Sequence, residues 1–105
     1  MTLDPEDSKI ITLARAARAR NGSAEGAAVR DETGRTYSAT DVKLAALSLS
    51  AVQVAVAMAI SSGARSLEAV AVVSEGEPGD GDRAVAAELG VPSLLVAGPD
   101  GTLRS

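Results

Sequence analysis

The sequence predicts an α/β fold, a three-layer α/β/α sandwich with a mixed sheet and the element order α-β-β-α-β-α-β. Three observations predict it. Residues 67–74 contain the nearly continuous apolar run Ala69 to Val73, typical of a central strand buried on both faces. Residues 4–21 have apolar positions at helical spacing, and residues 48–62 are long, apolar and rich in alanine. Strands and helices in this order pack in layers, and 105 residues fit one domain, residues 1–105.

The first helix is expected over residues 4–21. Asp4 can cap its N-terminus, and Pro5 suits the first turn, where a missing N–H costs little. Gly22 follows the last turn and favours its end there. Three arginines crowd the later turns: Arg15, Arg18 and Arg20. We interpret them as a solvated face that suits the negative end of the helix, with a binding stripe as the alternative.

Residues 26–31 and 35–42 predict a β-hairpin, because both runs are rich in strand-forming residues and Asp31 to Gly34 supplies a turn. Residues 48–62 alternate large and small apolar side chains as a strand does, but the length and the alanine content favour a helix. That helix is apolar on nearly every side, so it must be covered on more than one side. We therefore expect a partner subunit.

The remaining elements are a strand at 67–74, a short helix at 83–89 and a strand at 93–97. The stretch "EPGDGDR", residues 77–83, joins the first two. Its glycines could cradle a phosphate, but the spacing fits no phosphate-loop pattern and the acids would repel the ligand. Its acids could contact Ca²⁺ or Mg²⁺, but half of the needed ligands are missing. A turn followed by acids at a helix N-terminus is the simpler interpretation.

Composition excludes several functions. The chain has no Cys and no His, which rules out the usual zinc sites and leaves no histidine for acid–base chemistry. Tyr37 is the only aromatic residue, and the net charge is −4, so we expect no nucleic-acid partner. The longest apolar stretch, 44–60, is short for a membrane span, so we expect no membrane partner. The N-terminus lacks a signal-peptide pattern, which predicts a cytoplasmic protein.

Residues 25–73, "EGAAVRDETGRTYSATDVKLAALSLSAVQVAVAMAISSGARSLEAVAVV", resemble the cytidine deaminase family. In that family a V-G-A-A strand leads through a D-G turn to a strand ending in N-V-E-N. A helix opening with C-A-E or H-A-E follows and runs to an A-[IV]-A-V-V strand. The stretch "PGDGDR", 78–83, is similar to the family's P-C-x-x-C-R loop, and "VPSLLVAGPDG" to its closing strand and turn. The resemblance covers about residues 5–103 and implies the same fold, and a dimer or tetramer.

The resemblance also implies where the family's site falls in this chain. The zinc ligands correspond to Ser50, Gly79 and Asp82, and the catalytic Glu corresponds to Val52. The substrate-reading Asn and Glu of N-V-E-N correspond to two further positions, and the Arg of the loop to a third: Asp41, Lys43 and Arg83. A hydroxyl and a carboxylate make a poor zinc site, and valine transfers no proton.

We therefore expect a catalytically inactive relative of cytidine deaminase, with no catalytic residues, no metal and no cofactor. It would act as an oligomeric binding or interaction module, a homodimer or homotetramer with a possible protein partner. The alternative is a hydrolase or a binder of a nucleoside-like ligand that uses Asp82, Asp41 and Arg83 without zinc. The sequence names neither the ligand nor the pathway.

Overall fold

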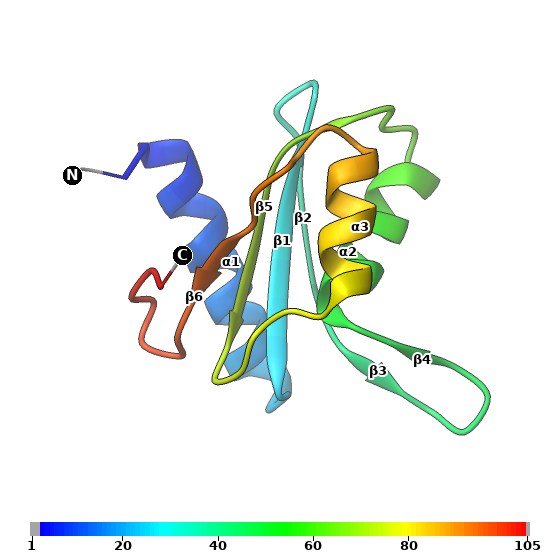
Figure 1. Cartoon of the computed structure of the whole chain (residues 1–105). Coiled ribbons are helices and arrows are strands. Elements are labelled where there is room, and N and C mark those ends of the chain that lie inside the picture. Colours follow the sequence, from blue (N-terminus) through cyan, green and yellow to red (C-terminus); the bar gives the residue numbers. More distant parts are fainter. Residues whose placement is uncertain (1–2, 105) are drawn as a thin grey trace.

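A computed structural model describes residues 3–104; Met1, Thr2 and Ser105, which complete the predicted domain, lie outside the described residues. The helices are α1 (Pro5–Asn21), α2 (Ala51–Ser61) and α3 (Asp80–Glu88). The strands are β1 (Glu25–Asp31), β2 (Thr36–Thr40), β3 (Val42–Lys43), β4 (Ser48–Leu49), β5 (Leu67–Ser74) and β6 (Leu95–Ala97) (Figure 1). None of the helices in this described part has the length and apolar character needed to cross a lipid bilayer.

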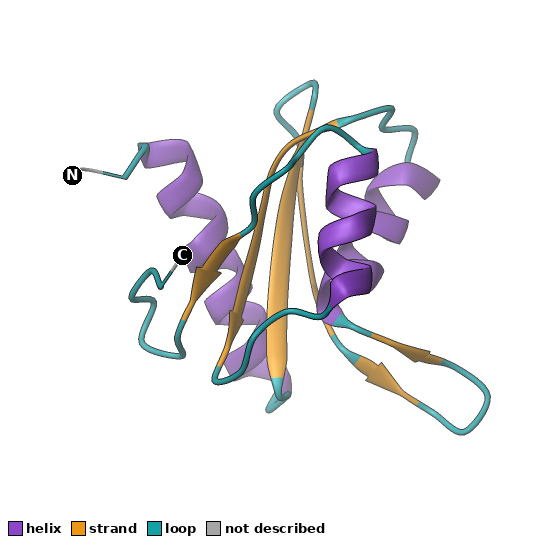
Figure 2. Cartoon of the chain, in the orientation of Figure 1, coloured by secondary structure: helices purple, strands orange, loops and turns teal. Residues whose placement is uncertain are grey.

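The main sheet has four strands in the order β2-β1-β5-β6. Strand β1 pairs antiparallel with β2 and with β5, and β5 pairs parallel with β6. Helix α1 covers one face, and α2 and α3 cover the other (Figure 2). This confirms the predicted α/β/α sandwich with a mixed sheet.

Two apolar clusters hold the layers together, one on each side of the sheet. The cluster under α1 includes Ile10, Ala14 and Val73, and the cluster under α2 and α3 includes Val52, Val70 and Val96. Strand β5 contributes to both because its residues alternate between the faces, and six of its last seven residues, from Ala69 to Ser74, are buried. The continuous apolar run predicted this central position, since both faces of the strand are covered.

The predicted start of α1 is confirmed in detail. The Asp4 carboxylate accepts a hydrogen bond from the Glu6 amide at 2.8 Å, and Gly22 ends the helix in the left-handed conformation with φ 62°. The predicted hairpin is confirmed as β1 and β2, with Asp31 to Gly34 in its turn. A first-turn acid and a last-turn base also suit the helix dipole at each end.

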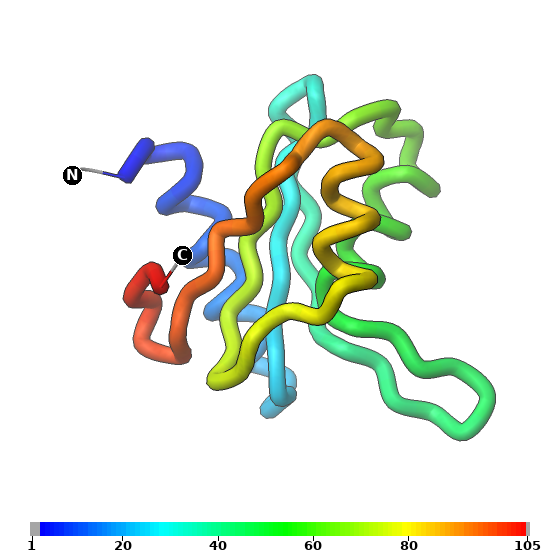
Figure 3. The backbone as a smooth tube through the Cα atoms, in the orientation of Figure 1, coloured from blue at the N-terminus to red at the C-terminus, as the bar shows by residue number. Residues whose placement is uncertain are grey.

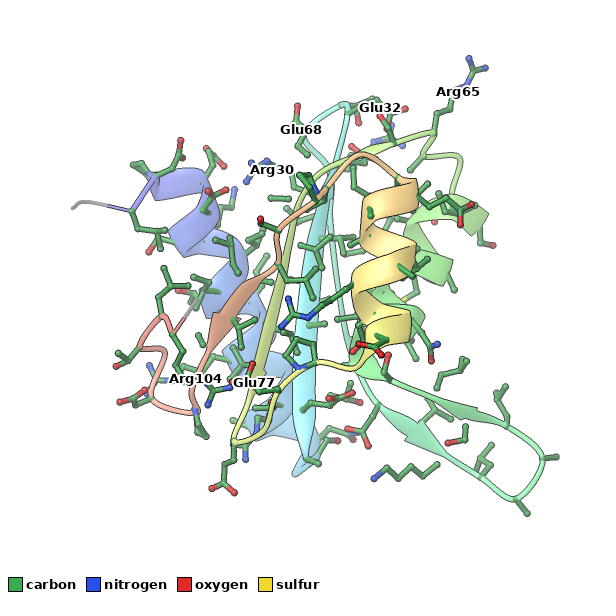
Figure 4. The ribbon with its side chains drawn as sticks, viewed as in Figure 1. Arg30, Glu32, Arg65, Glu68, Glu77 and Arg104 are labelled. Carbon is green, nitrogen blue, oxygen red and sulfur yellow. The ribbon has the colours of Figure 1, made fainter. Side chains whose placement is uncertain are left out.

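Arg30 makes two ion pairs, one that ties β1 to α1 and one that ties β1 to β5. Nη2 of Arg30, on β1, lies 3.1 Å from the Asp7 carboxylate, and its Nε lies 3.0 Å from that of Glu68. Figure 4 shows Arg30 beside Glu68 at one end of the sheet. Burial alone would lower the pKa of Arg30, but the hydrogen bonds to Glu68 and Asp7 outweigh it and raise the pKa. At the opposite end, the Arg104 guanidinium donates to the carbonyl oxygens of Glu75 and Gly76.

Four predicted elements have a boundary that differs from the structure by two or more residues. One is the strand expected over 93–97, because β6 begins at Leu95. The helix expected over 48–62 begins at Ala51, because Ser48–Leu49 forms β4 and pairs with β3. The strand expected over 35–42 ends at Thr40, and Val42 belongs to β3. The helix expected over 83–89 begins at Asp80, so two of the acids assigned to the loop, Asp80 and Asp82, occupy its first turn.

The β3–β4 hairpin, residues 42–49, projects from the body of the molecule, and we call it the arm (Figure 3). Leu44 donates its amide to the Leu47 carbonyl at 2.8 Å, which closes the turn at the tip. Leu44 is 64% exposed and Leu47 is 48% exposed. The sequence did not predict the arm, because each of its strands has only two residues.

Candidate functional site

The N-termini of α2 and α3 meet on one side of the sheet, and the candidate site lies at this junction. Ser50 is the N-cap of α2, and Gly79 is the N-cap of α3. Asp82 lies in the first turn of α3, is only 5% exposed, and accepts a hydrogen bond from the Ser50 hydroxyl at 2.5 Å. The structure thus brings together two of the three residues that the resemblance places at the zinc ligands.

Ser50 also makes a capping box. Its hydroxyl oxygen accepts from the Gln53 amide at 3.1 Å, and its own amide donates to Oε1 of Gln53 at 2.9 Å. This reciprocal pair satisfies two of the free amides at the start of the helix. The Ser50 hydroxyl therefore donates one hydrogen bond to Asp82 and accepts one from the Gln53 amide. Both of these bonds hold the protein's own structure together.

Val52, at the position that the resemblance assigns to the catalytic Glu, is fully buried. It packs with Val29, Val70 and the other residues of the cluster under α2 and α3. An isopropyl group in such a cluster neither donates nor accepts a proton.

Gly79 and Arg83 lie at the start of α3 but do not extend the site. Gly79 has no side chain, and an added Cβ would meet no atom within 4 Å. Arg83 is about half exposed, and its Nη2 lies 3.9 Å from the carboxylate of Glu77, in the loop before α3. Pairs this exposed contribute little.

A pocket of about 310 Å³ opens beside the start of α2. Three of the predicted residues line it: Asp41, Lys43 and Ser50. The residues Val52, Gly79, Asp82 and Arg83 are not part of its lining. Three of the seven predicted residues therefore line this pocket, and the other four lie at or near the helix junction.

Among the lining residues that were not predicted as site residues, Glu25 and Gln53 bind the start of α2 through their side chains. The Glu25 carboxylate accepts from the Ala51 amide at 2.7 Å, and the Glu25 amide donates to Oδ1 of Asp41 at 3.2 Å. Gln53 carried a usable signal, since a Ser followed three residues later by Gln before an apolar run predicts a capping box. Glu25 carried none, because its partner lies 26 positions away in the chain.

The donor set does not fit zinc. Zinc in proteins takes three or four ligands, mostly thiolate or imidazole, and the junction offers one hydroxyl and one carboxylate. Within residues 3–104, no group of three or more acidic, His or Cys side chains is placed to hold a metal ion. The acids of residues 75–82 thus do not gather into a Ca²⁺ or Mg²⁺ site, and the simpler interpretation as a turn and a helix start agrees with the geometry.

The comparisons with known proteins agree with this fold. Residues 3–101 match the family described as "Cytidine deaminase-like". The chain is similar to the crystal structure of cytidine deaminase from Burkholderia pseudomallei, with a TM-score of 0.77 and 30% identity over 91% of this chain and 87% of that one. It is also similar to cytidine deaminase from Mycobacterium tuberculosis, with a TM-score of 0.74 and 27% identity over 96% of this chain and 90% of that one.

Cytidine deaminase from Mycobacterium leprae shares the fold at 24% identity, with a TM-score of 0.72 over 96% of this chain and 93% of that one. No curated protein matches the sequence significantly.

Proposed function

The chain belongs to the cytidine deaminase-like family, and we propose that it is a member without deaminase activity that serves as an oligomeric binding module. One observation carries the proposal. The Ser50 hydroxyl donates to the Asp82 carboxylate at the place where the resemblance expects zinc, and Val52 is buried in the core at the place of the catalytic Glu.

The chemistry of deamination supports this proposal. Attack on the base needs a water activated by the metal and a carboxylate that moves its proton. The described residues at the junction supply neither a zinc ligand set nor a proton shuttle. Near neutral pH, an unassisted water is a weak nucleophile, so we expect no measurable turnover.

The test uses the purified full chain. We expect no ultraviolet absorbance change with cytidine or deoxycytidine, before or after incubation with zinc, and zinc far below one equivalent by elemental analysis. The Burkholderia pseudomallei enzyme, assayed alongside, controls for the substrates. Turnover together with stoichiometric zinc would overturn the proposal.

A second candidate function is the binding of a small polar ligand, favoured by the pocket of about 310 Å³. The acids and the amine that line it, Glu25, Asp41 and Lys43, suit a hydroxylated ligand of nucleoside type. The predicted use of Asp82 and Arg83 finds no support, because both lie outside this pocket. Thermal melting with cytidine, uridine or ribose tests it: a saturable rise in Tm, abolished by Asp41→Ala, is the expected result.

The proposed module is a homodimer or homotetramer. The outer face of α2 carries no charged residue and leaves Met58 and Ile60 each 41% exposed. The arm exposes Leu44 and Leu47. One chain thus carries two apolar surfaces free to pack on a second copy, although a different protein partner would also cover them. The cytoplasmic location expected from the sequence stays a prediction.

A further inference from the structure

The contact between Ser50 and Asp82 joins two helices through one buried pair. Asp82 is 5% exposed, and a buried carboxylate is costly unless it is hydrogen-bonded. Its partner is a hydroxyl on the other helix, 32 positions earlier in the chain. The pair therefore does more than cap either helix, since it fixes the start of α3 against the start of α2.

The geometry of this bond is that of a strong one. The oxygen atoms lie 2.5 Å apart, at the short end of the range for a hydroxyl that donates to a carboxylate. The serine is held in place from its other side, because its oxygen also accepts from the Gln53 amide. A donor fixed in this way loses little conformational freedom when it binds the carboxylate.

The linkage extends to the rest of the junction. Oε1 of Glu25, on β1, accepts from the Ala51 amide, the first of α2, and the Glu25 amide donates to Asp41 at the base of the arm. Hydrogen bonds thus connect the sheet, the arm and the starts of both helices at this junction. The connection uses only oxygen and nitrogen atoms of this chain.

We propose that the Ser50–Asp82 hydrogen bond is the structural replacement of a metal cross-link between α2 and α3. This inference rests on the proposed loss of the zinc site, and it adds that the chain supplies its own link at that place. The link makes the folded state independent of metal, and it makes Ser50 and Asp82 energetically coupled residues of the scaffold.

A double-mutant cycle tests the coupling, with Tm as the readout. Ser50→Gly removes the hydroxyl but keeps a residue acceptable at an N-cap, so the cap itself changes little. Asp82→Ala removes the acceptor. We expect each single variant to lower Tm by roughly 10 °C. The double variant should lower Tm by clearly less than the two single losses added together, because each change removes the same bond.

The matched control is Asp80→Ala. Asp80 is an exposed acid in the same first turn, so it shares the helix-dipole effect but not the bond to Ser50. A loss in Asp82→Ala no larger than in Asp80→Ala, or additive losses in the double variant, overturns the link. If Ser50→Gly does not fold, Ser50→Cys replaces it, with an intermediate loss expected from the weaker thiol donor. If Asp82→Ala does not fold, Asp82→Asn replaces it, with an intermediate loss expected from the neutral acceptor.

Metal independence is tested on the unmodified chain. We expect the same Tm with a chelator and with equimolar zinc, and a rise in Tm with zinc overturns the inference. The failure of this inference is distinguishable from the failure of the proposed function. Additive losses of Tm with no turnover reject only the link. Turnover with stoichiometric zinc rejects the proposed function and, with it, the replacement of a metal, even where the losses of Tm are coupled.

Discussion

Val52 lies in the packed core at the position that the resemblance assigns to the family's catalytic Glu. Its side chain is fully buried among apolar residues, so restoring the family's Glu at this position in the present background places a charge in the core. We expect Val52→Glu to lower the free energy of unfolding by roughly 3–5 kcal/mol, the typical cost of an uncompensated buried charge, and to restore no activity. Urea denaturation measures the loss.

Ala16→Glu is the control for this change. Ala16 is exposed on α1, on the other side of the sheet from the proposed α2 interface, so we expect a change within about 0.5 kcal/mol. A loss as small for Val52→Glu would mean that position 52 reaches solvent, and the assignment of this residue to the core would then be wrong.

Asp31 gives the chain a pH dependence of known sign. Burial raises the pKa of Asp31, but hydrogen bonds from the Thr33 hydroxyl and amide and from the Arg35 amide outweigh it and lower the pKa. The carboxylate therefore stabilises the fold above its unfolded pKa of about 3.9, and the contribution is lost as the pH falls through the lower folded value.

Asp31→Asn removes this contribution. We expect the variant to be less stable than the unmodified chain above about pH 5, and the difference to shrink as the pH falls below about 4. Thermal melting of both proteins, from above about pH 5 to below about pH 4, measures this difference in stability. A difference that stays constant down to low pH would assign the loss to the shape of the turn and not to the charge.

The sequence could predict which residues lie near the candidate site, but it could not predict most of the contacts that their side chains make. The resemblance placed Ser50 and Asp82 together, and the structure brings them to hydrogen-bonding distance. It also placed Asp41, Lys43 and Arg83 near one another, and only the first two line the pocket. Arg83 lies outside the pocket, and its guanidinium is 3.9 Å from the Glu77 carboxylate.

At the scale of elements, the close approach of α1 to β1 depends on Gly26. A Cβ added there would lie 2.1 Å from the Ala14 carbonyl oxygen and 2.9 Å from the Arg18 amide nitrogen, so the helix must move away. We expect Gly26→Ala to cost about 3 kcal/mol, at the upper end for an overpacked core. Gly76→Ala is the control, because its added Cβ meets nothing within 4 Å, and equal losses would contradict the packing argument.

The two helix starts allow a direct test of the proposed loss of the metal site. Replacing Ser50, Gly79 and Asp82 together by cysteine supplies three thiolates, and the Cβ added at position 79 meets no atom. We expect the triple variant to bind one zinc ion, measured by elemental analysis and by displacement with a chelator. The control is Ser50→Cys/Asp82→Cys, which has too few ligands. Failure of the triple variant would place the family's ligand positions elsewhere.

The elements that could be predicted are the ones whose signal is local. The cap at Asp4, the turn at 31–34 and the apolar run of β5 each depend on a few neighbouring residues. The arm depends instead on pairing between two strands of two residues, which is too short to leave a periodic pattern. The same strand pairing explains why α2 begins at Ala51 and not at residue 48.

At the scale of the whole molecule, the sandwich covers one face of α2 and leaves the other to solvent. The exposed side includes Met58 and Ile60, and the arm adds Leu44 and Leu47 at its tip. The expectation that α2 must be covered on more than one side came from its uniformly apolar sequence. A single sheet and one neighbouring helix, α3, do not provide that cover, because the described residues leave these side chains about half exposed.

We expect the purified chain to sediment as a dimer or tetramer of its 10.5 kDa subunit, and two variants to weaken the association. Met58→Glu places a charge on α2, and Leu44→Ser/Leu47→Ser removes the apolar tip of the arm. Each buried leucine contributes about 1.5–3 kcal/mol, so dissociation constants should rise at least tenfold. The control is Leu103→Ser, because Leu103 is 42% exposed near the C-terminal end of the described chain, away from both surfaces. A wild-type monomer at high concentration would reject the oligomer, whereas an equal effect of Leu103→Ser would move the interface to the other edge of the sheet.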